Sequence, residues 1–429
     1  MKFTAAGDAI IQRRIQDGFE GIEELAPFIQ RGDGRFFNLE TTVHCEGECY
    51  ASQFSGGTYL RTNPEMLDDL KKFGFNMTTF NNNHAMDFSY VGLLRTLEHL
   101  DNSGLVHSGV GRNMDEASAP RYLETPNGRV ALIAVNTTFE HSTMAGKQGR
   151  RTPGRPGVNG VRLEKKHHVT KDELEFIKKL ADRMQINVEN NIERRAGYMA
   201  PLPENEAEFA PLRFVLGEDT KYTLHVNEED MKRVEKAIYE AQFQADYTII
   251  SLHSHEIAGE NQEAVPDVLR EFAHACVDAG ANAIIGHGPH FLRPIEVYKD
   301  SPIFYSLGDF IIQLYSVELA PEEFYSKYGL TSDSTVHELM KTLSKDLSIG
   351  LMTKRIMFQT VIPYWETREK KLVTLELLPV ESKMIGHKSE IGLPRIAKDL
   401  SFIEHLDEIS AEYGVRMHVG EDGIVKCEW

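Results

Sequence analysis

The chain has 429 residues, of which 41% are hydrophobic and 26% are charged, and its formal net charge is −18. This composition excludes a disordered chain and predicts a globular protein with a large core. The acidic balance argues against non-specific binding to nucleic acid or to an anionic membrane surface.

The sequence contains no stretch typical of a membrane span or a secretory leader. Its apolar runs are all shorter than the roughly 20 residues that cross a bilayer. Asp8 interrupts the first apolar run before it reaches the roughly 7–15 residues of a signal sequence. The four cysteines lack the spacing of a zinc site, and free thiols fit a reducing compartment. We therefore expect a cytoplasmic protein with no membrane or nucleic-acid partner, and the sequence leaves its oligomeric state open.

Short apolar runs rich in β-branched and aromatic residues predict strands along the chain. These strands are expected at residues 2–6, 35–39, 77–80, 130–135, 247–252, 283–285, 303–306 and 372–380. Periodic apolar positions predict helices between them. The helices are expected at residues 64–73, 90–101, 170–184, 228–244, 265–279 and 393–413. The alternation of strands and helices favours an α/β fold.

Two stretches interrupt this alternation. Residues 140–225 are rich in Gly, Pro and charge and hold one helical segment, and residues 315–352 are polar and mixed. Long insertions over a compact framework are commonly functional lids. We therefore expect one main domain over residues 1–380 that carries both insertions, followed by a C-terminal extension of helix and strand over residues 381–429.

Reactive side chains follow the predicted strands, at the point where each strand ends. They are Asp8, Asn38, Glu40, Asn83, His84, His253, His255, His287, His290 and Asp309. Ligands of α/β sheets bind at the carboxyl edge of the strands, so these groups are expected to meet there. The residue types suit a divalent metal ion, because imidazole binds zinc, iron and similar ions and carboxylates add negatively charged oxygens.

The spacing of these groups indicates which role each would have in a metal site. A pair of metal ions needs a bridging carboxylate, and Asp8 or Glu40 is placed to provide one. His253 and His255 are two residues apart and therefore face the same side of a strand. A Gly-Pro turn lies between His287 and His290, and this turn is expected to direct both rings to one point.

Each residue also has an ordinary structural interpretation. Asp8 follows a glycine as a helix N-cap would, and Glu40 has the sequence setting of a loop carboxylate. Asn83 lies in a run of three asparagines that would shape a turn, and a lone histidine such as His84 is more often structural than a ligand. Asp309 fits a turn as well as a group that orients a ligand.

The order of the motifs GD, NLE, NNHAMD, SLHSHE, GHGPH and YSLGDF, from Gly7 to Phe310, resembles the CapA family of poly-γ-glutamate capsule proteins within the calcineurin-like metallophosphatases. The resemblance implies a four-layer αββα sandwich of the metallophosphatase type with inserted lid segments. It also implies one or two divalent ions (Mn, Zn or Fe), or none. The residues it assigns to metal or catalysis are Asp8, Glu40, Asn83, His84, His253, His287 and His290.

The sequence departs from the family pattern at several positions. Ile10 stands where metallophosphatases have the histidine of Asp-x-His, and Glu40 replaces an aspartate. The family's SLHWG, GHHPH and SLGNF are here SLHSH, GHGPH and SLGDF. These changes remove one histidine and add His255 and Asp309, whose side chains can donate or accept a proton.

Three functions remain open at this point. The first is a metal-dependent hydrolase or transferase that acts on a peptidic, glutamate-containing or phosphoester substrate, with Asp8, His84, His255 and His287 in catalysis. The second is a metal-independent peptide epimerase of a ribosomal peptide cluster, which needs two acid/base groups flanking the substrate. The third is a non-catalytic accessory protein that binds a polyanion.

A basic segment indicates the charge of the substrate. Residues 147–171 hold eight Lys and Arg residues against one Glu in an otherwise acidic chain. Such a segment either aids solubility or draws in an anionic small molecule or peptide. Arg150, Arg151 and Arg155 are expected to contact that substrate, because guanidinium binds carboxylate or phosphate in a bidentate fork. Asn38 and Asp309 are further expected substrate contacts.

Overall fold

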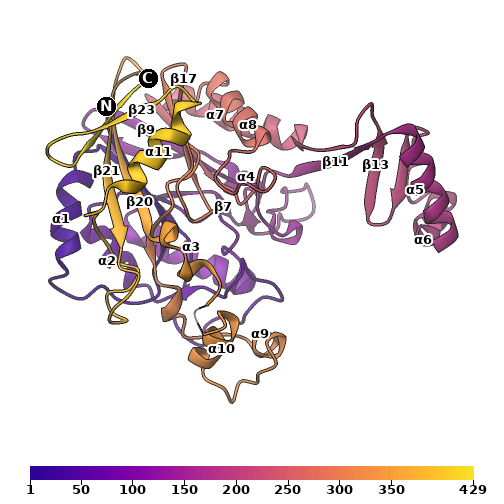
Figure 1. Cartoon of the computed structure of the whole chain (residues 1–429), viewed down its shortest axis with the longest axis horizontal. Coiled ribbons are helices and arrows are strands. Elements are labelled where there is room, and N and C mark those ends of the chain that lie inside the picture. The colour runs from indigo at the N-terminus through magenta and orange to yellow at the C-terminus, as the bar shows by residue number, and fades with distance from the viewer. Residues whose placement is uncertain (347) are drawn as a thin grey trace. The chain divides into compact units, whose positions relative to one another are not determined.

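The computed structural model describes residues 1–346 and 348–429 (Figure 1). The chain forms two compact units, one made of Met1–Val161 with Lys232–Trp429 and the other of Arg162–Met231. Helices and several sheets alternate along the chain, which confirms the predicted α/β class. Among the described residues, no helix combines the length and apolar character needed to cross a bilayer.

The larger sheet of the first unit has ten strands within the described residues, in the order β23-β24-β21-β20-β1-β2-β5-β6, with β19 paired to β1 and β22 paired to β21. Their bounds are β1 (Lys2–Ile10), β2 (Gly34–Leu39), β5 (Met77–Thr79), β6 (Val106–Ser108), β19 (Asp309–Ile312), β20 (Gln359–Arg368), β21 (Lys371–Ser382), β22 (Pro394–Ile396), β23 (Arg416–Val419) and β24 (Val425–Glu428). β1, β2, β5 and β6 are parallel, whereas β20 pairs antiparallel with both β1 and β21.

The smaller sheet of the first unit has six strands within the described residues, in the order β17-β18-β16-β15-β9-β8. Their bounds are β8 (Arg121–Thr125), β9 (Gly128–Asn136), β15 (Tyr247–His253), β16 (Ala283–His287), β17 (Ile295–Tyr298) and β18 (Ser301–Phe304). The central strands β9, β15, β16 and β18 are parallel, and β8 and β17 are antiparallel edge strands. Their carboxyl ends therefore share one edge of the sheet.

The two sheets share a core, because successive residues of a strand point to opposite faces. Phe36 of β2 packs in one apolar cluster with Leu132 and Ile249 of the smaller sheet. The next residue, Phe37, faces the other way and packs with Leu70 and a set of helix residues. Both faces of β2 are therefore buried.

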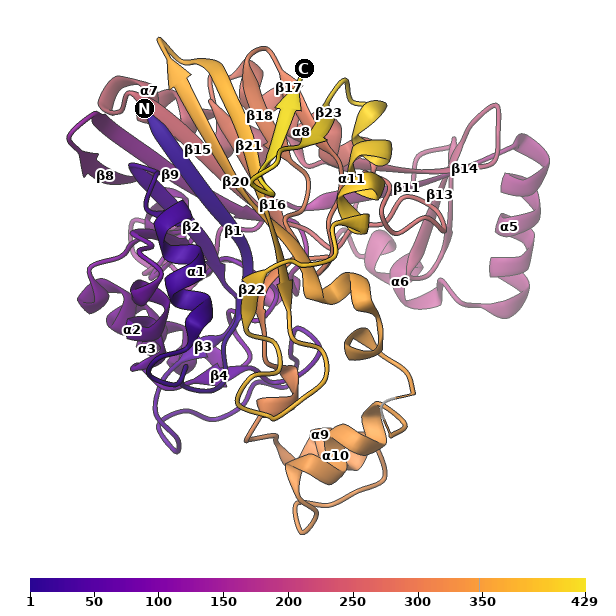
Figure 2. The same ribbon diagram turned by 60° about the vertical axis from the view of Figure 1, so that its left-hand side comes forward.

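Helices cover the outer faces of these two sheets (Figure 2). α1 (Glu20–Ile29), α2 (Met66–Lys72) and α3 (Ser89–Ser103) contribute the apolar residues that pack on the outer face of the larger sheet. α8 (Asp267–Asp278) connects the parallel strands β15 and β16, and α7 (Glu228–Gln244) precedes β15. Because the shared core takes the inner face of that sheet, its crossover helix lies on the outer face. The layers of this unit therefore run helices, sheet, sheet, helices.

Shorter elements complete the first unit. They are β3 (Thr42–Val43), β4 (Arg61–Thr62), β7 (Val110–Gly111), α4 (Met114–Ser118), η1 (His141–Thr143), β10 (Gly157–Val158), η2 (Leu314–Ser316), α9 (Glu322–Lys327), α10 (Val336–Leu343), η3 (Leu351–Thr353), η4 (Arg355–Phe358) and α11 (Ser401–Ala411). The predicted insertion at 315–352 thus contains two helices and short turns in its described part.

The second unit has a four-stranded sheet within the described residues, in the order β12-β13-β11-β14. Its elements are β11 (Leu163–Val169), α5 (Lys171–Met184), α6 (Val188–Arg195), β12 (Glu206–Phe209), β13 (Leu212–Leu216) and β14 (Lys221–Val226). Its small core joins Val169, Leu174 and Ala207. The sequence indicated only a helix here, because a strand such as LEKKHHV carries too much charge for an apolar pattern.

One predicted helix is wrong in its first part. The apolar spacing predicted a single helix over residues 393–413, but Pro394–Ile396 forms β22 and α11 begins only at Ser401. β22 pairs antiparallel with β21, so pairing with the large sheet overrides the local helical pattern in this segment.

Candidate metal centre

Asp8 lies inside β1, at a point where the pairing of this strand is irregular. The register of β1 shifts between Ala5 and Asp8 against β2, and just after Asp8 against β19. A Cβ on Gly7 would lie 1.8 Å from the carbonyl oxygen of Gly308, so only glycine allows this approach. The amide of Asp8 donates to the same carbonyl at 2.9 Å. The sequence placed Asp8 at the end of a strand; the strand instead continues past it.

Hydrogen bonds from two directions hold the Asp8 carboxylate. The side-chain amide of Asn38 donates to Oδ1 at 2.6 Å, and the backbone amide of Gly288 donates to Oδ2 at 2.9 Å. The amide of Asn82 in turn donates to the Asn38 oxygen at 3.3 Å. Asn38, which the sequence suggested as a substrate contact, therefore fixes the orientation of Asp8 in this structure.

Two histidines approach Asp8 from the smaller sheet. His253 and His287 are directly paired in the register of β15 and β16, and their Nδ1 atoms lie 2.9 Å apart. The Nδ1 of His287 is 3.5 Å from Asp8 Oδ1, and its Nε2 is 2.6 Å from the hydroxyl of Ser251. The Nε2 of His253 lies 3.1 Å from the Nε2 of His255, as their period-two spacing predicts. The edges of both sheets thus meet at one cluster.

A second group of acidic residues lies on the other side of Asp8. His290 donates from Nδ1 to Asp309 at 2.9 Å, and the same atom is 3.8 Å from Asp8 and 3.9 Å from Glu40. His290 has a backbone φ of 66°, an uncommon value for a residue other than glycine. The turn that follows β16 is therefore held in a strained form that brings this ring to the carboxylates.

Two of the buried carboxylates, Glu40 and Asp309, have oxygens without a hydrogen-bond donor among the described residues. Glu40 and Asp309 are fully buried, and both oxygens of Glu40 and the Oδ2 of Asp309 have no hydrogen-bond partner in the part of the chain that the structure describes. A buried carboxylate without a donor is costly unless a cation neutralises it. The donor set, oxygen and imidazole nitrogen, is one that zinc, iron and manganese accept. The residues present therefore fit a divalent metal ion.

Three overlapping groups of residues bring their ligand atoms within 4.8 Å of one another. They are Asp8 with His253 and His287, Glu40 with His253 and His255, and Asp8 with Glu40, His290 and Asp309. Asp8, Glu40 and His253 each belong to two groups, so these residues join the groups into one cluster. Asn83 extends the set, because its amide oxygen lies 2.8 Å from the Nε2 of His253.

Burial and neighbouring charges shift the pKa values of the clustered residues in different directions. Burial raises the pKa of Glu40 well above its usual value, and the Asp8 carboxylate adds to the rise. Burial lowers the pKa of His253 well below its usual value and that of His287 to about 4. Burial also lowers the pKa of His290, but Asp309 and Glu40 outweigh it and raise that pKa to about 10. His253 and His287 are therefore uncharged at neutral pH, and each has one ring nitrogen without a proton, whereas His290 is protonated.

Metal binding is expected to release protons, since a cation displaces the proton held by His290. With a pKa of about 10, His290 is protonated at pH 7, so the affinity for Mn²⁺ should rise with pH from about 7 to 10. Calorimetric titrations in buffers of different ionisation enthalpy measure the number of protons released, which should be at least one at pH 7, because burial also raises the pKa of Glu40 and raises that of Asp309 to about 7. In His290→Gln the number of protons released should fall by about one. Binding with no proton release in the unchanged protein would contradict the assignment.

His84 is oriented by a residue that the sequence did not single out. Its Nδ1 lies 2.7 Å from Oδ2 of Asp87, a buried carboxylate that also accepts the backbone amides of Gly56 and Leu60. This leaves Nε2 directed at the Gly56 backbone, where an added Cβ would lie 2.7 Å away. His84 is absent from the three clustered groups among the described residues. The signal available in the sequence was the spacing of His and Asp three residues apart in NNHAMD.

The basic residues of the insertion lie apart from these contacts. Arg150 and Arg151 are exposed, and the guanidinium of Arg155 donates to the carbonyl of Met144 at 2.9 Å. The cluster itself is more enclosed. Among its residues, His255 and Asn83 are the partly exposed ones.

These features define a class of protein: an α/β protein of two facing sheets with a buried carboxylate and imidazole cluster fit for divalent metal. The chain also matches the bacterial capsule synthesis protein PGA_cap family over residues 2–314. Since this match covers most of the chain and every residue of the cluster, the chain belongs to the PGA_cap family, as its motifs indicate.

Related proteins come from several bacteria. The uncharacterized protein y4sH of Sinorhizobium fredii is 31% identical over 97% of this chain and 90% of its own length. The capsule biosynthesis protein CapA of Bacillus anthracis is 22% identical over 72% of this chain and 59% of its own length. A probable polyglutamine synthesis accessory protein of Mycobacterium tuberculosis is 25% identical over 91% of this chain and 75% of its own length.

Proposed function

We propose that this protein is a metal-dependent hydrolase or transferase that acts on an amide bond of an anionic, glutamate-containing peptide or polymer. The observation that carries the proposal is the pair of buried, donor-free oxygens of Glu40 beside the imidazoles of His253 and His290. The layer order of the first unit supports a sandwich of the metallophosphatase type. The names of the Bacillus and Mycobacterium relatives, which refer to capsule and polyglutamine synthesis, support the choice of substrate.

In this proposal the clustered residues hold one or two divalent ions, of which Mn, Zn and Fe fit the donor set. A bound ion supplies Lewis acidity, which polarises the carbonyl of the scissile bond and stabilises the charge that develops on it. Asp8 and Glu40 provide the shared carboxylates, and Asn38 keeps Asp8 in position. Asn83 adds its amide oxygen beside His253.

His84 is the proposed proton donor to the leaving nitrogen. Asp87 lies 2.7 Å from Nδ1 of His84 and so orients the ring with its Nε2 near Gly56, where Asn83 also lies. The partly exposed His255 is the proposed second acid/base group, and its backbone amide is fixed by the hydroxyl of Thr138 at 2.8 Å. A general acid placed in this way contributes about 10²–10⁴-fold to a rate.

The function is tested by mass spectrometry of poly-γ-glutamate and α-linked oligoglutamate after incubation with Mn²⁺-loaded protein in H₂¹⁸O. Shorter chains with ¹⁸O in the new carboxyl groups are the expected result. Parallel reactions in D₂O with metal-free protein detect the alternative of an epimerase, which would place deuterium at Cα without chain cleavage. A bis(p-nitrophenyl) phosphate assay examines a phosphoester substrate.

The outcomes separate the proposed functions. Cleavage that requires metal supports the hydrolase, and deuterium exchange without metal would replace it with the epimerase. If neither peptide changes while both bind, the protein is an accessory protein that holds the polymer. Exposed Glu46→Gln is the matched control for substitutions at Glu40, because both change one carboxylate and only Glu40 is buried.

The basic residues Arg150, Arg151 and Arg155 are expected to recruit the anionic substrate. Changing all three to Glu should lower kcat/KM about 10-fold or more at low salt, and the loss should shrink as salt screens the charges. The control changes Arg368, Lys370 and Lys371 to Glu at the β20–β21 turn, which lies at the sheet edge opposite Asp8. Equal kcat/KM and equal salt dependence in the two variants would leave the three arginines without a role in substrate capture.

A further inference from the structure

A separate cavity of about 690 Å³ lies in the first unit, away from the carboxylate and histidine cluster. Its walls come from the ends of β20 and β21, from β22 and η4, and from α1. Its size lies within the roughly 300–1,000 Å³ of pockets that bind small molecules. None of its lining residues belongs to the candidate metal centre.

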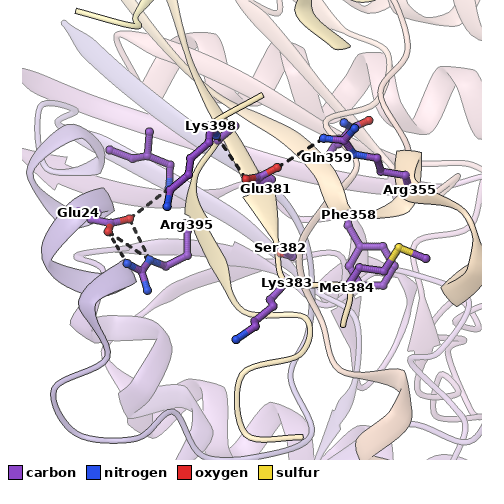
Figure 3. A pocket seen from close by; sticks show the side chains of 12 residues that line it. Glu24, Arg355, Phe358, Gln359, Glu381, Ser382, Lys383, Met384, Arg395 and Lys398 are labelled. Carbon is purple, nitrogen blue, oxygen red and sulfur yellow. Dashed lines mark hydrogen bonds and ion pairs between the residues drawn. The ribbon is translucent and has the colours of Figure 1, made fainter. Parts of the chain in front are cut away.

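The cavity has a charged side and an apolar side (Figure 3). Glu24 and Arg395 form a bidentate pair at one side, with nitrogen–oxygen distances of 2.7–3.1 Å. Phe358 and Met384 lie at the opposite side, and Ser382 lies between the two. A ligand that fills the cavity therefore meets both an apolar surface and charged groups.

Two polar side chains of the wall have no hydrogen-bond partner within the described residues. Ser382 is only 5% exposed, and its hydroxyl oxygen is buried without a partner. The side-chain amide of Gln359, which is 7% exposed, also makes no hydrogen bond to the described residues. A buried hydroxyl without a partner is destabilising, and a polar group of a ligand would satisfy it.

The charges that line the cavity favour an anion. The lining residues include the cations Arg355, Lys383, Arg395 and Lys398 and the carboxylates Glu24 and Glu381. Three of the cations already have carboxylate partners. The ammonium group of Lys398 has no ion-pair partner among the described residues, although its backbone amide donates to Glu381 at 3.3 Å. The charge of Lys398 also acts on the Glu24 carboxylate, but without an ion pair within 4.0 Å among the described residues, so its ammonium can still contact a ligand.

We propose that this cavity binds a small amphipathic carboxylate, which is a carboxylate group on an aliphatic body. The carboxylate accepts from the hydroxyl of Ser382 and is attracted by the ammonium of Lys398. The aliphatic body packs on Phe358 and Met384. This site is independent of the metal centre and of the proposed hydrolase activity.

Decanoate is the probe for this proposal, and decyltrimethylammonium is its cationic counterpart with the same chain. Isothermal titration should show saturable binding of decanoate, about 10-fold or more tighter than that of the cation. Ser382→Ala should weaken decanoate binding about 10-fold, in keeping with the loss of a hydrogen bond to a charged group. Lys398→Glu should weaken it at least as much, because it reverses the available charge. Ala397→Trp should abolish binding by filling the cavity.

Circular dichroism identifies a variant that fails to fold, and Ser382→Ala and Lys398→Glu each test the site if Ala397→Trp is unstable. Manganese stoichiometry should stay unchanged in all three variants, since none of them touches the metal centre. The proposal is overturned if decanoate does not bind saturably at millimolar concentration. It is equally overturned if the cation binds as well as decanoate, or if folded Ser382→Ala and Lys398→Glu bind decanoate like the unchanged protein.

Discussion

Glu40→Gln is expected to weaken divalent metal binding about 100-fold or more while making the metal-free protein more stable. Glu40 belongs to two of the three groups of clustered ligand atoms, and even a residue that only orients a metal ligand commonly contributes 10–100-fold in affinity. In the metal-free protein the same carboxylate is buried without a donor and lies near Asp8. Replacing it with a neutral amide should raise the free energy of unfolding by about 1–3 kcal/mol at pH 7.

The pH dependence of this gain follows from the raised pKa of Glu40. When an acidic group has a higher pKa in the folded state than in the unfolded state, the protein loses stability as pH rises above the unfolded pKa, which is about 4.3 for Glu. The advantage of Glu40→Gln should therefore be absent near pH 4 and grow toward pH 7. Urea unfolding in the presence of chelator measures this difference in the free energy of unfolding, and Glu46→Gln is unfolded in the same way as the control. A metal-free variant that is less stable than the unchanged protein at pH 7 would show that Glu40 is a structural residue.

His84→Asn is expected to lower kcat by about 10²–10⁴-fold without removing metal, because His84 is the proposed proton donor and is outside the three groups of ligand atoms. Asp87→Asn should lower kcat less, since it disturbs the orientation of the His84 ring rather than removing it. Kinetics on the oligoglutamate substrate and elemental analysis of the same samples measure both effects. The high-pH limb of the pH–rate profile, where a proton donor becomes deprotonated, should also change in both variants.

His107→Asn is the matched control for His84. His107 is also buried, and its Nε2 lies 2.9 Å from Asp101, so this substitution breaks a similar histidine–aspartate pair away from the cluster. Its kcat should remain within about threefold of the unchanged protein. If His84→Asn instead loses its metal and His107→Asn does not, His84 is a ligand rather than a proton donor.

Sequence patterns predicted the parts of this structure that depend on local signals. β-branched runs located eight of the 24 strands in the described residues to within a few residues, such as the strand at 77–80 that is observed as Met77–Thr79. The helix at 228–244 has the expected bounds because its charged and apolar residues alternate with helical spacing. The convergence of the cluster was also predicted, since parallel strands bring their carboxyl ends to one edge.

Features that depend on contacts distant in the sequence were not predicted. The irregular pairing of β1 at Asp8 arises from the close approach of Gly308, about 300 residues away, which no local pattern reveals. The segment at Pro394–Ile396 joins the large sheet because β21 offers it a pairing edge. The orientation of His84 by Asp87 needs the turn that brings the two together. In each case tertiary contacts outweigh local preference.

The central claim is that Asp8, Glu40 and the surrounding histidines form a metal centre. The most direct test is elemental analysis of the unchanged protein and of a variant that combines Asp8→Asn with Glu40→Gln, after both are incubated with Mn²⁺ and desalted. We expect about one to two equivalents of manganese in the unchanged protein and less than about 0.2 in the folded variant. An unchanged protein that retains less than about 0.1 equivalents of Mn²⁺, and equally little Zn²⁺ or Fe²⁺, would contradict the claim.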